Sequence, residues 1–101
     1  MYSVVWTRQA KKDHRFIVGN ALAVKLAEIL NTVRASPFES TPSHCFEKLK
    51  GYNPPIYTRR LDYYNRFVYT VESNVNGAKD RDGILYDGIV VIHRMWGHFP
   101  P

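Results

Sequence analysis

Apolar and polar residues in the first third of the chain follow two different periods. Residues 2–6 carry large apolar side chains at every second position, which is the period of a β-strand. Residues 21–34 carry them at steps of three and four, which is the period of a helix that buries one face. Between these segments, Thr7 can cap a helix that runs to about Val18, and Gly19 suits the left-handed residue that ends it. The pattern therefore predicts one strand followed by two helices.

The later part of the chain returns to the period of two. Two prolines disfavour helical geometry within residues 36–45, so this stretch is expected to be a connecting loop. β-prone runs follow at residues 56–61 and 66–71, joined by the turn-forming sequence Asp-Tyr-Tyr-Asn, and a last run rich in Ile and Val covers residues 88–96. The sequence predicts three or four strands after the two helices.

Residues 73–87 separate the last two of these runs. Three turn dipeptides mark this region: Asn76-Gly77, Asp82-Gly83 and Asp87-Gly88. Such dipeptides favour tight turns because glycine accepts backbone angles that other residues avoid. We expect a flexible or hairpin-like excursion between the two strands.

Helices gathered at the start of a chain and strands at its end are typical of an α+β domain. We expect two N-terminal helices packed on one face of a mostly antiparallel sheet of four to five strands, with the other face of the sheet left free. The chain has 101 residues, which is the length of one domain, so residues 1–101 are expected to form a single domain.

Charge and composition narrow the function classes. Fourteen Lys and Arg against nine Asp and Glu give a formal net charge of +5, which favours nucleic acid, the ribosome or an acidic protein as partner, although the same charge could serve solubility alone. No apolar run approaches the ~20 residues of a membrane span or forms a signal peptide, so we expect a cytoplasmic protein with no membrane partner. Cys45 is the only cysteine, which excludes an internal disulfide and a cysteine-based zinc cluster.

Five basic residues lie within a short stretch: Lys48, Lys50, Arg59, Arg60 and Arg66. Neighbouring residues of a strand point to opposite faces, so Arg59 and Arg60 cannot both belong to one solvated face. A sheet face that carries several of these cations could hold phosphates. The alternative is that the arginines pair with acids such as Asp62 or Glu72, or protect a sheet edge from aggregation.

Two further side chains could transfer protons. Glu47 precedes the basic stretch, where its carboxylate could either pair with a neighbouring Lys or accept a proton as a base. His98 stands between Trp96 and Phe99, and this aromatic context indicates a segment that is packed or used rather than frayed. No two histidines have the i, i+4 spacing of metal ligands, so we expect no metal site.

Five short strings occur in order along the chain: Pro37-Phe38-Glu39, Glu47-Lys48-Leu49-Lys50-Gly51, Tyr57-Thr58-Arg59-Arg60-Leu61, Asn65-Arg66-Phe67-Val68-Tyr69 and Met95-Trp96-Gly97-His98-Phe99. With them the chain resembles the Txe/YoeB branch of the RelE/ParE toxin superfamily, whose usual strings are close to PFE, EKLKG, YSRRI, HRLVY and MWxHY. The resemblance spans nearly the whole chain. It implies a microbial-ribonuclease-like α+β fold and a toxin that cuts messenger RNA in the small-subunit decoding site of the translating ribosome, without a metal or cofactor.

The same resemblance assigns roles to single residues. Glu47 matches the catalytic glutamate, which would take the proton of the RNA 2′-hydroxyl, and His98 matches the histidine that would protonate the leaving 5′-oxygen. Arg66 matches the essential arginine, which would stabilise charge on the phosphate. RNA contacts are implied or expected for four more residues: Lys50, Arg59, Arg60 and Phe99. The family usually has tyrosine at the last of these positions, so a phenolic hydroxyl is missing here.

The resemblance also implies a protein partner and leaves two other functions open. A toxin of this kind is encoded with an antitoxin that covers its basic, partly apolar surface. ParE-like relatives share the fold but inhibit DNA gyrase without cutting RNA, and fold alone does not fix function. A degenerate member that binds the ribosome or the antitoxin without cutting is the other alternative, for which Phe99 is the only supporting feature.

Overall fold

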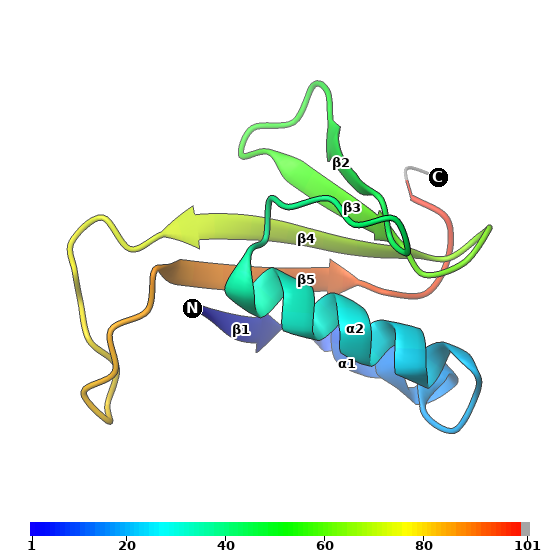
Figure 1. Ribbon diagram of the computed structural model, residues 1–101, viewed down its shortest axis with the longest axis horizontal. Coiled ribbons are helices and arrows are strands. Elements are labelled where there is room, and N and C mark those ends of the chain that lie inside the picture. Colours follow the sequence, from blue (N-terminus) through cyan, green and yellow to red (C-terminus); the bar gives the residue numbers. More distant parts are fainter. Residues whose placement is uncertain (100–101) are drawn as a thin grey trace.

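The computed structural model describes residues 1–99 as a layer of two helices and a five-stranded sheet (Figure 1). In chain order the elements are β1 (Tyr2–Trp6), α1 (Arg8–Ile17), α2 (Leu22–Ala35), β2 (Phe46–Leu49), β3 (Ile56–Arg60), β4 (Arg66–Ser73) and β5 (Gly88–Arg94). The strands lie in the order β1-β5-β4-β3-β2, with β1 parallel to β5 and the other three pairings antiparallel. The predicted α+β class, with two helices on a mostly antiparallel sheet, is confirmed.

Both ends of α1 form as the sequence predicts. The Thr7 hydroxyl accepts a hydrogen bond of 3.1 Å from the backbone N–H of Ala10, which satisfies a donor that the first helical turn leaves free. Gly19 follows the helix with a φ of 84°, a left-handed conformation that a side chain would disfavour. Neither described helix is long and apolar enough to cross a membrane.

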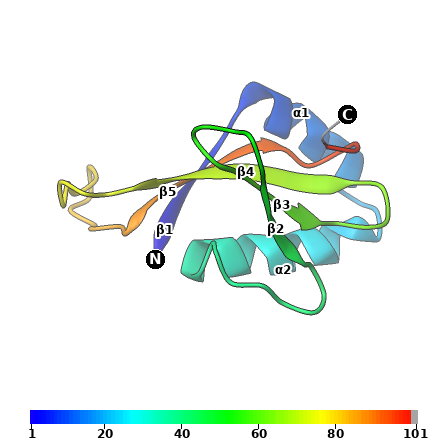
Figure 2. The same ribbon diagram turned by 90° about the horizontal axis from the view of Figure 1, so that it is seen from above.

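The helices and one face of the sheet share a single apolar core. Figure 2 shows α2 on one side of the sheet, and α1 next to the ends of β1 and β5. The buried apolar residues of this cluster are Ala10, Ile17, Leu26, Ile29, Val33, Leu61, Phe67, Tyr69, Val90, Ile92 and Met95. Because successive strand residues alternate between the two faces, the residues between these core positions project onto the opposite face. On that face, Phe99 from the segment after β5 lines a hollow together with Val68 and Thr70 of β4.

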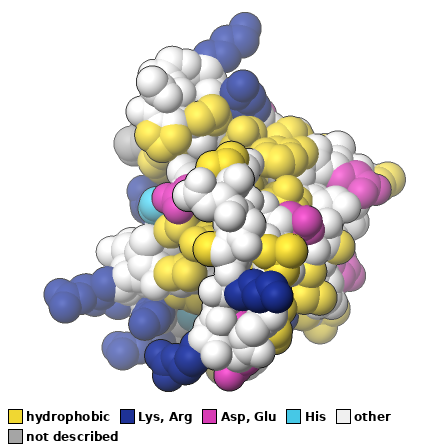
Figure 3. All heavy atoms as spheres, turned by 90° about the vertical axis from the view of Figure 1, so that its left-hand side faces the viewer, with side chains coloured by type: hydrophobic (Ala, Val, Ile, Leu, Met, Phe, Trp, Pro, Cys, Tyr) yellow, Lys and Arg dark blue, Asp and Glu magenta, His cyan; other side chains and the backbone are white. Residues whose placement is uncertain are grey.

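The excursion between β4 and β5 is hairpin-like, one of the two forms that its turn dipeptides predicted. The Asn74 side chain donates to the carbonyls of Ala78 and Tyr86, and Lys79 forms an isolated antiparallel bridge with Leu85. Figure 3, which faces this end of the molecule, shows hydrophobic, basic and acidic side chains intermixed on it. The excursion projects from the end of the sheet that is opposite the β3–β4 turn (Figure 1).

Gly88 is the first residue of β5, whereas its dipeptide with Asp87 predicted a turn. A Cβ atom at this position would overlap the carbonyl oxygen of Glu72 and lie 3.1 Å from the Tyr2 ring, so the strands approach too closely for a side chain. We expect Gly88→Ala to lower the free energy of unfolding by about 1–3 kcal/mol, as measured by urea denaturation. Ser73→Ala, at the exposed position that pairs with Gly88, serves as the control and should change little. Equal losses in the two variants would contradict this explanation.

Candidate functional site

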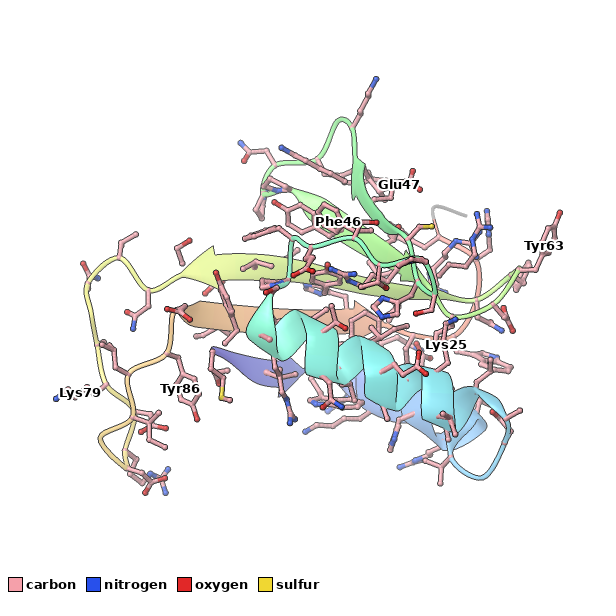
Figure 4. All side chains as sticks on the ribbon, viewed as in Figure 1. Lys25, Phe46, Glu47, Tyr63, Lys79 and Tyr86 are labelled. Carbon is pink, nitrogen blue, oxygen red and sulfur yellow. The ribbon has the colours of Figure 1, made fainter. Side chains whose placement is uncertain are left out.

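The strand register places three of the expected site residues on one face of the sheet. Arg60 on β3 pairs with Arg66 on β4, so both side chains project to the same side. Glu47 on β2 pairs with Thr58, two positions before Arg60, and therefore shares that side as well. This is the face opposite the helical core. Figure 4 shows Glu47 on β2 and Tyr63 at the outer tip of the β3–β4 turn.

Glu47 and Arg66 share a face but are not in contact. Glu47 is two strands away from β4 and one row of side chains away from Arg66, which corresponds to about 12 Å between their Cα atoms from the usual strand spacing and rise. Within residues 1–99, no hydrogen bond or ion pair joins Glu47 to Arg66 or to His98. A substrate that contacted all three groups would have to span this distance.

The segment that carries His98 is anchored to the rest of the fold. Met95 is fully buried, and its backbone N–H donates to the buried Asp13 carboxylate on α1 at 3.0 Å. Gly97 then donates to the Asn65 side chain at 2.7 Å, and its carbonyl accepts from the Arg66 backbone at 3.0 Å. The backbone before His98 is therefore fixed against β4, while the imidazole itself is exposed. This agrees with the expectation that the terminal aromatic segment is packed.

An open hollow of about 290 Å³ lies where this segment meets the β3–β4 turn, lined by Arg60, Tyr63, Tyr64, Arg66 and His98. The Tyr64 and His98 rings lie with their centroids 5.5 Å apart. Two arginines and a histidine thus converge on one hollow without an acidic side chain in its lining. A phosphate is the ligand that the two guanidinium groups would bind.

The Arg66 guanidinium is oriented by the turn that precedes it. Its Nη1 donates to the carbonyl oxygens of Asp62 and Tyr63, each at 3.1 Å. Burial alone would raise the pKa of Asp62, but hydrogen bonds from Asn65 and Tyr64 and the nearby Arg66 hold this pKa below its ordinary value. The ionised Asp62 therefore holds the β3–β4 turn at neutral pH. The carbonyls of this turn then hold the Arg66 guanidinium in place.

The expected RNA contact of Arg59 is wrong. Arg59 is fully buried on the helical side of β3. Its Nε donates to the Tyr69 hydroxyl at 3.1 Å, its Nη2 donates to the Pro37 carbonyl at 3.1 Å, and its Nη1 lies 3.3 Å from His44 Nδ1. A guanidinium with all three nitrogens engaged inside the protein is not accessible to RNA. The two adjacent arginines thus divide into a structural one and one that reaches the open face.

The buried Arg59 also fastens the strand that carries Glu47. Its guanidinium lies 5.3 Å from the centroid of the Phe46 ring, and Phe46 stacks on Tyr57 at 5.3 Å. Through its bonds to Pro37 and His44, Arg59 connects the loop before β2 to the sheet. Glu47 follows Phe46 directly, so its place on the open face depends on this buried cluster. The pattern of apolar residues did not delimit β2 as a separate strand.

Protonation of His44 is opposed by its surroundings. Burial, and after it the Arg59 guanidinium, lower the pKa of His44 from its ordinary value of 6.5, while Glu28 acts in the opposite direction. The unfolded chain therefore takes up this proton more readily than the folded one. The stability that neutral His44 contributes is complete above about pH 6.5 and declines as the pH falls below that value.

We accordingly expect urea denaturation to show a lower free energy of unfolding at about pH 5 than at about pH 7.5. His44→Gln, which does not titrate, should reduce this pH dependence. Burial also lowers the pKa of His93, so His93→Gln is needed to separate the second contribution of the same sign. An unaltered pH dependence in His44→Gln would show that the buried cluster does not carry the effect.

The two remaining RNA contacts expected from the sequence lie at the margins of the site. Lys50 is exposed directly after β2. The Phe99 ring lies beneath the Arg94 guanidinium, with 5.9 Å between the guanidinium carbon and the ring centroid, and 6.3 Å from the Tyr52 ring. Within residues 1–99, no three His, Cys, Asp or Glu side chains are grouped so that they could hold a metal ion.

Three residues position the site in ways that the sequence did not predict. Asp13 accepts a hydrogen bond from Met95, and Asn65 accepts one from Gly97. The Tyr64 ring lies against the His98 ring. Asp13 is a buried acid on a helix, which the helical period alone does not single out. Asn65 stood in the turn of the predicted hairpin, but only the folded chain shows that it bonds to a residue 32 positions away.

The architecture described above is shared with solved structures of YoeB/ParE toxins. The chain aligns with the YoeB/ParE toxin from Agrobacterium tumefaciens at a TM-score of 0.72 and 20% identity, covering 96% of this chain and 99% of that one. For the YoeB dimer from Staphylococcus aureus the values are 0.68 and 24%, covering 97% and 98%. For the YoeB-YefM complex from the same organism they are 0.67 and 22%, covering 98% and 99%. No protein-family model and no curated protein matches the sequence.

Proposed function

We propose that this chain is the toxin of a toxin–antitoxin pair and that it cuts messenger RNA on the ribosome. The observation that carries the proposal is the placement of Glu47, Arg66 and His98 around one open face, with the backbone before His98 anchored to the sheet. The YoeB toxins with which the chain shares its fold support the same assignment. Residues that serve only the fold would not require an exposed carboxylate, an exposed imidazole and a half-buried guanidinium on one face.

The chemistry needs only groups that RNA and this chain supply. The 2′-hydroxyl of RNA stands next to the scissile phosphate and is the nucleophile. Glu47 takes its proton as the oxygen attacks phosphorus, and protonated His98 gives a proton to the 5′-oxygen as the bond to phosphorus breaks. The products are a 2′,3′-cyclic phosphate and a free 5′-hydroxyl. Each such transfer typically contributes about 10² to 10⁴ in rate.

The cations hold the phosphate and stabilise the charge that develops on it. Arg66 is oriented by two carbonyls of the turn, so its guanidinium is preorganised for the pentavalent phosphorus species. Arg60 lies opposite Arg66 in the register and lines the same hollow. Lys50 would hold a flanking phosphate from the end of β2. Because Glu47 lies well away from Arg66, we propose that the ribosome supplies the RNA conformation that brings the reacting groups together.

The antitoxin is the second partner that we propose. A solved structure with this fold contains YoeB with YefM, as its name states. The exposed cations of the open face call for an acidic segment, and the apolar side chains around Phe99 call for an amphipathic one. Such a segment would cover the site and block access of RNA.

The experiment that tests the proposal adds the purified chain to a bacterial translation extract and maps breaks in a reporter message by primer extension. We expect discrete cuts within translated codons that disappear when ribosomes are omitted. Fragments should end in a 2′,3′-cyclic phosphate. An intact message would overturn the proposal, and inhibition of DNA gyrase supercoiling would then be the next activity to assay.

A further inference from the structure

A second hollow, of about 400 Å³, lies on the same open face next to the proposed catalytic residues. It is bounded by the loop that enters β3, by β4 and β5, and by the segment after β5. The residues that shape it are Tyr52, Ile56, Val68, Thr70, His93 and Phe99. Its volume falls within the range of small-ligand sites. None of the catalytic steps described above uses this groove.

Its lining suits a flat ligand that carries hydrogen-bonding groups on its edge. The Tyr52 and Phe99 rings have their centroids 6.3 Å apart and form the aromatic boundary, and Val68 contributes an apolar floor. At the inner end, the Thr70 hydroxyl and His93 Nε2 are 2.8 Å apart. Aromatic rings that stack and a polar pair that reads an edge are the two means by which proteins bind unpaired bases.

Charge and position point to the same ligand. No acidic residue lines the groove, and Arg94 contributes a guanidinium beside Phe99. Arg66, Val68 and Thr70 alternate along the same face of β4, so the groove begins beside the phosphate hollow and extends about 14 Å from Arg66. Phe99 follows His98 directly and faces the groove. RNA with its phosphate between Arg66 and His98 would therefore present a neighbouring base at this groove.

We propose that this groove binds one nucleobase of the RNA next to the scissile phosphate and so selects which codons are cut. The inference rests on the proposed function and adds a specificity site to it. Tyr52 offers a stacking surface, since 42% of the residue is exposed. The Thr70–His93 pair reads the edge of the base. Burial lowers the pKa of His93, so its ring is neutral at neutral pH, and because Nε2 bonds to the Thr70 hydroxyl, the pair presents the remaining hydrogen-bonding capacity of that hydroxyl to a base.

Binding can be tested without cleavage. Trinucleotides with 2′-deoxy sugars lack the nucleophile, and NMR titration with a set of them would follow the amide signals of Thr70, His93 and Phe99. We expect shifts at these positions, with affinities that differ between trinucleotides. Tyr52→Ala should weaken binding roughly 5- to 100-fold, as expected for one lost stacking contact, and Tyr52→Phe should retain it.

The specificity itself is tested in the translation extract. Thr70→Val removes the hydroxyl that pairs with His93 and should change the distribution of cuts among codons more than the total amount of cutting. Shifts confined to Arg66 and His98, together with an unchanged codon distribution in Thr70→Val, would overturn the groove inference and leave the ribonuclease proposal intact. Shifts in the groove without any cutting of the message would leave base binding standing and refute the ribonuclease.

Discussion

Alanine in place of His98 is expected to slow cutting of the message by about 10² to 10⁴-fold, the usual contribution of one general acid. The leaving 5′-oxygen would then have to depart as an alkoxide or take its proton from water. Glu47→Ala should cause a loss of similar size, because the 2′-hydroxyl would keep its proton until attack. The measurement is the initial rate of reporter cleavage in the translation extract, with growth arrest on induction as a second readout.

Both side chains are exposed, so neither substitution should unfold the protein. Circular dichroism and the urea midpoint would establish this for each variant. Lys79→Ala, on the excursion at the far end of the sheet, serves as the matched surface control and should cut at the wild-type rate (Figure 4). Normal cutting by both the His98 and the Glu47 variants would refute the assignment of roles.

Substitutions at the two adjacent arginines should separate stability from activity. Arg59→Ala removes a fully buried side chain and leaves its partners, including the His44 ring and the Tyr69 hydroxyl, with fewer contacts. We expect it to lower the free energy of unfolding by about 3 kcal/mol or more. Arg60→Ala should change this free energy by about 0.5 kcal/mol or less, because the side chain is exposed.

The activities should follow the opposite order. Arg60→Ala would remove a phosphate contact from a folded protein and slow cutting roughly 10- to 100-fold, the equivalent of one lost charge-assisted hydrogen bond. Arg59→Ala, assayed at a temperature where it is still folded, should lose activity mainly through a misplaced β2. Urea denaturation and the cleavage assay on both variants provide the comparison. A stable Arg59→Ala protein that fails only in RNA binding would contradict the buried role described above.

The helices, the main strands and the fold class could be predicted because their signals are local. Thr7 and Gly19 mark the ends of α1 by their own conformational preferences, and the period of apolar residues identifies α2. The five strings identified the candidate site residues through the resemblance. The fold shared with YoeB/ParE toxins confirms this resemblance at the level of architecture. The assignment of catalytic roles stays a prediction that the variants above would test.

The rest depended on contacts between distant parts of the chain. Alternation required Arg59 and Arg60 to face opposite ways, but only the pairing of β3 with β4 and the burial beneath Phe46 decide which one faces the open side. The turn predicted at Gly88 was wrong, because the glycine there permits a close approach between two strands. Local preferences predict neither the direction of the two arginines nor the close approach at Gly88, because the residues that decide each lie far away in the sequence.

The parallel pairing of β1 with β5, together with the bond from Met95 to Asp13, has a consequence for synthesis of the protein. The first strand and first helix cannot reach their final places until residues 88–97 have left the ribosome that makes them. At that stage the nascent chain has neither the complete five-stranded sheet nor a fixed His98, because domains complete their folding only when their long-range contacts can form. While residues 88–97 are still inside the ribosome, the nascent chain would therefore lack the anchored His98 that the proposed cutting requires.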